Sequence, residues 1–264
     1  MLEGLVINAG VDLAMMIVLC LVAVRIGDVS FIDAVWGAGM AVLALAAFVQ
    51  LGDPGARAGL LLAMTAIWGL RLGVHLFTRW RAEGEDPRYA RMLGKARAEG
   101  RYGWAAFRVV FGPQAALLFI TSLPAQMGIL GAAAPAPVGA LGWAGLALWL
   151  TGVTFETVGD AQLKAFRADP ANRGRVLDTG LWRYTRHPNY FGDACAWWGI
   201  WLVAAEAGAL VALVSLVGPL FLTFTLTRWS GKPLLEKSLV RNRPGYADYV
   251  ARTSGFIPWP PKRG

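Results

Sequence analysis

Long apolar stretches constrain the fold of this chain more than any other feature. Seven stretches of about 20 residues, the length that crosses a bilayer as a helix, contain few charged side chains. Their predicted bounds are 5–24, 31–51, 58–77, 105–130, 139–158, 190–205 and 209–227. Charged residues make up only 16% of the 264, against about a quarter in soluble domains. We therefore expect an all-α integral membrane protein with seven transmembrane helices.

The basic residues predict an orientation. Of the 25 Lys and Arg residues, seven lie in 78–104, six in 159–188 and eight in 228–264, whereas the connections 52–57 and 131–138 carry one between them. Since basic residues collect in cytoplasmic loops, we expect an external N-terminus and a cytoplasmic C-terminus. This bias accounts for the net charge of +8, so no nucleic-acid partner is expected. An excess of Arg over Lys hints at a GC-rich bacterial genome and an inner-membrane location.

The segment 180–193 concentrates polar chemistry at the start of an apolar stretch. It contains Arg183, Tyr184, Arg186, His187, Asn189, Tyr190 and Asp193. Pro188 fixes its own φ and disfavours helical geometry at His187, so a helix is predicted to begin just after it. Backbone donors at such a helix start suit an anion.

Two other polar groups precede and follow this segment. Glu156, Asp160, Lys164 and Arg167 are spaced one turn apart, which also fits an interfacial helix with salt-bridged neighbours. In the C-terminal segment, Glu236 lies in an amphipathic stretch predicted to form a surface helix. Tyr246, Tyr249 and Trp259 follow it, and interfacial anchoring explains these aromatic residues equally well.

Several common site types are excluded by the residues present. With only His75 and His187 and two separate cysteines, we expect no metal site. The sequence lacks a glycine-rich dinucleotide fingerprint, a phosphate loop and a nucleophile elbow. Cys20 and Cys195 fall in apolar stretches and are expected to pack there.

Several motifs together resemble the steroid 5α-reductase superfamily, and within it a bacterial branch of multispan proteins. They are Arg186-His-Pro-Asn-Tyr-Phe-Gly-Asp193 followed by Trp197-Trp-Gly, Gly180-Leu-Trp-Arg-Tyr, Tyr246-x-x-Tyr249, and a middle region with Trp68-Gly-Leu-Arg71 and Gly84-Glu-Asp-Pro-Arg88-Tyr89. The resemblance covers the chain from about Asp33 to its C-terminus.

The resemblance implies one seven-helix domain over residues 1–264, with a substrate cavity in 1–131 and the cofactor NADPH in 132–264. Family cofactor positions match Asp160, Arg167, Asn189 and Asp193, and Lys164 replaces an arginine. We expect further cofactor contacts from Arg183, Tyr184, Arg186, His187, Tyr190, Glu236, Tyr246 and Tyr249. Arginine and lysine suit the phosphates of a dinucleotide.

The reaction implied is reduction of a conjugated carbon–carbon double bond in a hydrophobic, steroid-like or isoprenoid-like enone. The family's substrate-polarising tyrosine is replaced here by Leu76. Intramembrane polar residues are therefore the candidates for substrate activation, and we select His75 and Asp33. Asn8 and Asp12 share one face of the first stretch, where hydrogen-bonded helix packing fits as well.

Two other functions remain open on sequence. Isoprenylcysteine carboxyl methyltransferases share an Arg-His-Pro-x-Tyr block and a membrane fold, and they bind S-adenosylmethionine. The other possibility is a membrane protein without enzymatic activity. The reductase is favoured by Asn189 and by the Trp197-Trp-Gly motif that follows it. The arginine-rich loops also favour it, since S-adenosylmethionine has no phosphate to neutralise.

Overall fold

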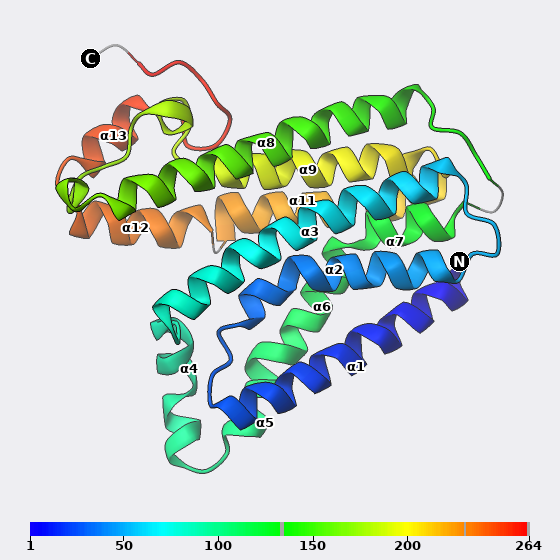
Figure 1. Cartoon of the computed structure of the whole chain (residues 1–264), viewed down its shortest axis with the longest axis horizontal. Coiled ribbons are helices and arrows are strands. Elements are labelled where there is room, and N and C mark those ends of the chain that lie inside the picture. Colours follow the sequence, from blue (N-terminus) through cyan, green and yellow to red (C-terminus); the bar gives the residue numbers. More distant parts are fainter. Residues whose placement is uncertain (133–134, 230, 263–264) are drawn as a thin grey trace. The chain divides into compact units, whose positions relative to one another are not determined.

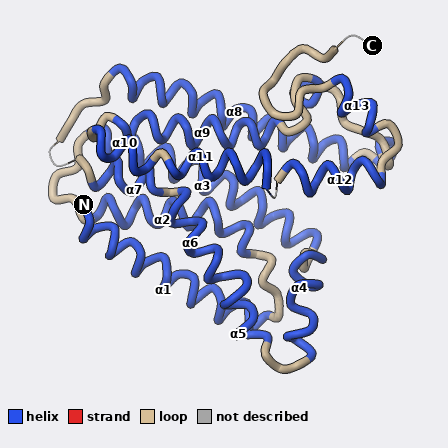
Figure 2. The backbone as a smooth tube through the Cα atoms, turned by 180° about the vertical axis from the view of Figure 1, so that it is seen from behind, coloured by secondary structure: helices blue, strands red, loops and turns tan. Residues whose placement is uncertain are grey.

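The computed structural model describes residues 1–132, 135–229 and 231–262. Within these residues it contains helices and loops but no strand (Figure 2). Residues 133–134, in the predicted connection 131–138, lie outside the described residues. The same holds for residues 230 and 263–264, in the predicted C-terminal segment 228–264. The all-helical expectation is confirmed for the described part of the chain.

The first unit comprises residues 1–143 and 200–218. Its helices are α1 (Leu2–Ile26), α2 (Ile32–Val49), α3 (Ala56–Glu83), α4 (Pro87–Ala98), α5 (Tyr102–Ala106), α6 (Gly112–Thr121), α7 (Leu123–Leu130) and α10 (Ala209–Ser215), and a π-helical turn η1 (Phe107–Phe111) joins α5 to α6 (Figure 1).

The second unit comprises residues 144–199 and 219–264. It contains most of α8 (Ala140–Ala168) and α9 (Pro188–Ala205), the 3₁₀ turns η2 (Pro170–Asn172) and η3 (Gly180–Arg183), most of α11 (Val217–Phe224), the π-helical turn η4 (Thr225–Trp229), α12 (Lys232–Asn242) and α13 (Tyr246–Arg252).

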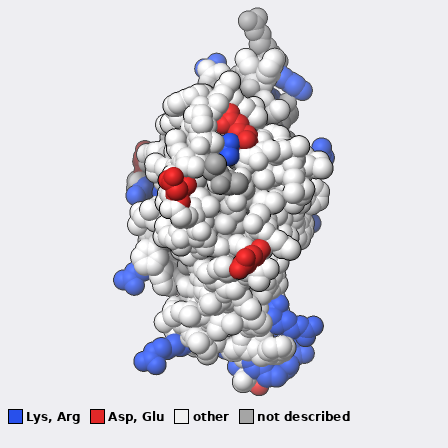
Figure 3. Space-filling view, turned by 90° about the vertical axis from the view of Figure 1, so that its right-hand side faces the viewer, with Lys and Arg blue, Asp and Glu red and all other residues white. Residues whose placement is uncertain are grey.

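Five candidate membrane spans are present among the described residues. They are Leu2–Ile26, Ile32–Val49, Ala56–Glu83, Tyr102–Thr121 and Ala209–Asn242, the last of which includes position 230, outside the described residues. Large apolar side chains such as Val6, Leu13 and Leu21 are exposed along α1, which suits contact with lipid. The face in Figure 3 is mostly uncharged, and basic side chains gather at its lower end. The predicted fifth and sixth spans coincide with α8 and α9, which are not among the five, so the count of seven and the orientation remain predictions.

Two predicted spans are interrupted where proline enters a helix. Pro124 has no N–H and cannot continue the hydrogen-bond ladder, so the predicted helix 105–130 is broken at Ser122, between α6 and α7. The Ser122 hydroxyl bonds to Leu118 O at 2.8 Å, and Gln126 Nε2 donates to Phe119 O at 3.1 Å. The predicted span 209–227 is divided likewise, since α10 ends at Ser215 and α11 contains Pro219.

A buried polar network joins three helices of the first unit. Asn8 of α1 donates to Leu43 O at 3.0 Å and to Gln126 Oε1 of α7 at 2.9 Å, and Gln50, which follows α2, donates to Asn8 Oδ1 at 3.0 Å. Asn8 and Gln126 are fully buried. Hydrogen-bonded packing between helices, one of the roles expected for Asn8, is therefore confirmed.

Glycines set the closest helix contacts. A Cβ on Gly37 of α2 would lie 2.7 Å from the carbonyl oxygen of Gly69 in α3. In the second unit, a Cβ on Gly192 of α9 would lie 2.5 Å from Gly152 O of α8, and one on Gly199 would lie 2.5 Å from Gly145 O. Because the later residue of α9 meets the earlier residue of α8, these helices are antiparallel. This register places Asp160 of α8 beside Asn189, in the first turn of α9.

Candidate functional site

Helix α9 begins at Pro188, as the sequence predicts. A residue before proline avoids helical geometry, and Pro188 occupies the first position of α9. The preceding residues Thr185, Arg186 and His187 are all buried. The C-terminal loop fixes them from the other side, since Arg186 N donates to Ser254 O at 2.9 Å and Thr185 Oγ1 donates to Phe256 O at 2.8 Å.

Arg186 is held in one orientation by the end of α13. Its Nη1 donates to Val250 O at 3.0 Å and also to Thr253 O. The other edge of the guanidinium meets Glu236 of α12, with Nε 2.7 Å from Oε1 and Nη2 3.3 Å from Oε2. Such a two-pronged contact is the geometry in which arginine binds carboxylate or phosphate. The backbone contacts therefore orient this edge of Arg186 toward an oxyanion.

His187 reaches the same carboxylate. Its Nε2 lies 2.9 Å from Glu236 Oε1, and its ring stacks on Tyr190 with centroids 5.0 Å apart. The His187 side chain is only 2% exposed, and this burial lowers the pKa of the imidazole despite the nearby Glu236 carboxylate. The neutral ring can still donate from Nε2. Arg186 and His187 thus direct three nitrogen atoms at one carboxylate.

The two C-terminal tyrosines are packing residues. Tyr246 and Tyr249 are 5% and 1% exposed, and their rings pack edge to face. Tyr249 donates to Trp182 O at 2.5 Å, and burial raises the pKa of Tyr246 to about 12. Interfacial anchoring does not describe these two residues, whereas Trp259 is exposed.

The four polar residues spaced one turn apart on α8 differ in burial. Glu156 is 2% exposed, and Asp160 accepts a hydrogen bond from Asn189 Nδ2 at 3.3 Å. Asp193 lies one turn further along α9 and is partly buried, whereas Lys164 and Arg167 are exposed. The structure therefore brings Asp160 and Asn189 together and leaves two cations of α8 accessible to an anionic ligand.

Arg183 and Tyr184 lie at the end of η3 and are both exposed. Two contacts that the sequence did not suggest hold this turn. Gln162 Oε1 accepts from Leu181 N at 3.0 Å, and Trp182 Nε1 donates to Gly159 O at 3.1 Å. Trp182 belongs to the motif Gly180-Leu-Trp-Arg-Tyr and Gln162 to no motif, and only the folded chain reveals the contact that each one makes.

A second polar cluster lies in the first unit, around Asp33 of α2. The Asp33 carboxylate accepts from Tyr89 Oη at 2.8 Å and from Arg88 Nη2 at 3.2 Å, both on α4. Arg88 also pairs with Asp86 at 2.8 Å, and this hydrogen bonding lowers the pKa of Asp86. Asp86 is the N-cap of α4 and precedes a proline at the first position. The motif Asp86-Pro-Arg88-Tyr89 thus starts a helix and supplies both partners of Asp33.

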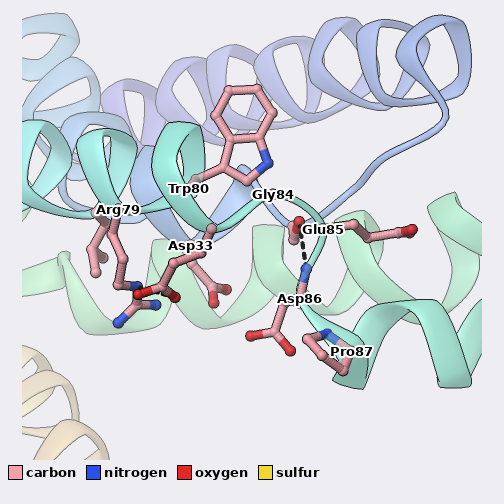
Figure 4. A pocket seen from close by; sticks show the side chains of 10 residues that line it. Asp33, Arg79, Trp80, Gly84, Glu85, Asp86 and Pro87 are labelled. Carbon is pink, nitrogen blue, oxygen red and sulfur yellow. Dashed lines mark hydrogen bonds and ion pairs between the residues drawn. The ribbon is translucent and has the colours of Figure 1, made fainter.

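Asp33 also lines a small pocket together with Ser30, Arg79, Trp80 and residues 83–87. In Figure 4 the Asp33 carboxylate points toward the side chain of Arg79, and the Asp86 amide donates to Ser30 Oγ at 3.2 Å. The pocket volume is about 80 Å³, far below the roughly 300 Å³ at which ligand pockets begin. Leu76 also lines this pocket, while His75 is half-buried one residue earlier on α3.

Metal-ligating residues do not gather in the described part of the chain. No group of three or more His, Cys, Asp or Glu side chains among these residues can hold a metal ion. Both cysteines are buried and unbonded to each other, as expected for packed residues.

The chain belongs to the DUF1295 family, described as proteins of unknown function, whose model matches residues 19–253. This range includes Asp33, His75 and all the predicted cofactor residues. No curated protein and no solved structure matches the chain.

Proposed function

We propose that this member of the DUF1295 family is a membrane-embedded, NADPH-dependent reductase of a conjugated carbon–carbon double bond in a hydrophobic enone. The observation that carries the proposal is the convergence of Arg186 and His187 on one carboxylate at the start of α9. Their three nitrogen atoms suit a phosphate group equally well. The resemblance of the surrounding motif to steroid 5α-reductases supports the choice of NADPH.

The remaining candidate residues fit the parts of a dinucleotide. Lys164, Arg167 and Arg183 are exposed cations of the same unit and suit the other phosphates. Asp160 and Asn189 lie side by side and offer acceptors and a donor to ribose hydroxyls or a carboxamide. Tyr246 and Tyr249 pack against each other in the same unit. The residues present therefore fit the cofactor by their chemistry.

NADPH, when bound, would supply a hydride to the β-carbon of the enone. The chain itself must stabilise negative charge at the substrate carbonyl, and His75 and Asp33 remain our candidates for that role. Asp33 already accepts hydrogen bonds from Tyr89 and Arg88. We propose that it acts by holding these two donors in place. The substrate and the bacterial inner-membrane location belong to this proposal.

Thermal unfolding of the detergent-purified protein tests the cofactor. A ligand that binds only the folded state at 100 times its Kd adds about 2.7 kcal/mol of stability, so NADPH should raise the Tm by several degrees. NADH should raise it less, because it lacks the 2′-phosphate. S-adenosylmethionine should leave it unchanged, and stabilisation by S-adenosylmethionine alone would refute the reductase in favour of a methyltransferase.

Site variants locate the cofactor. Arg167→Ala and Asn189→Ala should each weaken NADPH binding about tenfold, the effect of losing one charged or hydrogen-bonded contact. Lys95→Ala, at an exposed position of the other unit, is the matched control and should bind normally. Unchanged affinity in both test variants would contradict our placement of NADPH.

A further inference from the structure

The Arg186 cluster contains more positive than negative charge. Lys232, in the first turn of α12, approaches Arg186 over Gly255, where a Cβ would collide with Lys232 Nζ and with Arg186 Nη2. Glycine at 255 therefore lets two cations come close together. Glu236 is the carboxylate that contacts Arg186 and His187. The cluster thus holds two permanent cations and one carboxylate, and Arg186, which does not belong to α12, keeps its attraction for an anion.

Glu236 belongs to a helix that is otherwise weakly held. None of the residues of α12 is buried, and most of its side chains, including Leu234, Leu235 and Val240, are exposed. In contrast, Arg186 and His187 are nearly inaccessible, with side chains 8% and 2% exposed. A helix with few buried apolar contacts opens at low free-energy cost. The contact through Glu236 is therefore the main polar attachment of α12 to this cluster.

The oxyanion-binding edge of Arg186 does not depend on Glu236 for its orientation. Nη1 is fixed by Val250 O and Thr253 O of the α13 end, and the His187 ring is fixed by stacking on Tyr190. Both donors would keep their positions if the carboxylate left. The site is thus preorganised for an oxyanion and contains one supplied by the chain itself.

We propose that Glu236 is an internal competitor for a phosphate-binding site formed by Arg186 and His187, and that a phosphate-bearing ligand binds there by displacing Glu236 and releasing α12. The inference rests on the proposed function in that it concerns the same residues, but it requires only a phosphate group and no redox chemistry. Glu236 is then a regulator of the site and not a cofactor contact. The fraction of protein that binds the phosphate-bearing ligand depends on how readily α12 leaves.

Hydrogen–deuterium exchange on the wild-type protein, with inorganic pyrophosphate as the probe, tests this displacement. Saturating pyrophosphate should increase deuterium uptake in residues 232–242 and leave α1 unchanged. Unchanged uptake in α12 at saturating pyrophosphate overturns the proposal. The measurement needs no variant, so it stands even if a substitution at Glu236 prevents folding.

A variant series then measures the competition. Since a ligand's apparent affinity falls by the fraction of competent protein, Glu236→Gln should bind pyrophosphate on the order of tenfold more tightly than wild type. Lys237→Gln, at the next and exposed position of α12, is the matched control and should not change affinity. Equal or weaker binding by Glu236→Gln overturns the proposal. Displacement by pyrophosphate without stabilisation by NADPH would support this inference while refuting the reductase.

Discussion

At the scale of single residues, the Arg186 side chain is bonded on both edges of its guanidinium group. It contacts two backbone carbonyls and one carboxylate while only 7% exposed. Arg186→Lys removes the paired geometry and leaves buried oxygens without donors. We expect a loss of about 3 kcal/mol of folding free energy, seen as a lower Tm in detergent. Arg183→Lys, three residues away and exposed, should leave the Tm unchanged. A Tm for Arg186→Lys equal to wild type would contradict this assignment.

The pKa of His187 predicts a pH dependence of stability. Burial lowers the pKa of the folded imidazole, so the unfolded chain binds a proton at higher pH than the folded chain. The resulting stability is present above about pH 6.5, the unfolded value, and is lost as the pH falls toward the folded pKa. The Tm should therefore decline between pH 7 and pH 5. His187→Gln, which keeps a donor but does not titrate there, should show a shallower decline, and equal slopes would refute the assignment.

At the scale of helices, the α8–α9 contact predicts a strong effect of side-chain size. A Cβ at Gly192 would lie 2.5 Å from Gly152 O and 2.7 Å from Glu156 N, and backbone atoms cannot yield as a flexible side chain can. Gly192→Val should destabilise the protein by about 3 kcal/mol or more. It should also weaken NADPH binding, because the helix shift separates Asp160 from Asn189. Gly59→Ala, a helical position with open space, should not lower the Tm. Tolerance of Gly192→Val would show that the helices are further apart.

The polar network of α1, α2 and α7 predicts a smaller effect. Asn8→Leu removes the donor to Gln126 Oε1 and the acceptor for Gln50. Hydrogen bonds between membrane helices contribute about 0.6 to 2 kcal/mol, so we expect a loss of that size in thermal unfolding. Leu13→Ala, on the exposed side of α1, serves as the control. A Tm for Asn8→Leu at or above wild type would show that the network does not stabilise helix packing.

At the scale of the whole molecule, the predicted count of seven spans places the two termini on opposite sides of the membrane. A C-terminal fluorescent-protein fusion should fluoresce in bacterial cells, and an N-terminal alkaline phosphatase fusion should be active, because the first folds in the cytoplasm and the second outside it. Cysteine labelling at the exposed positions Asp53 and Lys95 should give opposite accessibility to an impermeant reagent. Termini on the same side would rule out an odd number of spans.

Much of the helical architecture could be predicted because hydropathy and proline act locally. Five of the predicted stretches overlap candidate spans, and the start of α9 at Pro188 is confirmed. Local reasoning also places Glu236 on a helix, which is confirmed as α12. The break at Ser122 was missed, although Pro124 signals it, because apolar length alone suggested one continuous helix from 105 to 130. The hydrogen-bond penalty of a proline outweighs hydropathy there.

The amino-acid sequence by itself determined the helical, membrane-embedded character of the protein and its candidate polar residues, because a bilayer selects apolar segments by length and composition. Only the tertiary structure decided how those residues combine. It paired Arg186 and His187 with Glu236 about fifty positions later, buried Tyr249 against Trp182, and attached Asp33 to Arg88 and Tyr89. Such contacts depend on helix register and close approach at glycine, which are properties of packed pairs of helices and not of either segment alone.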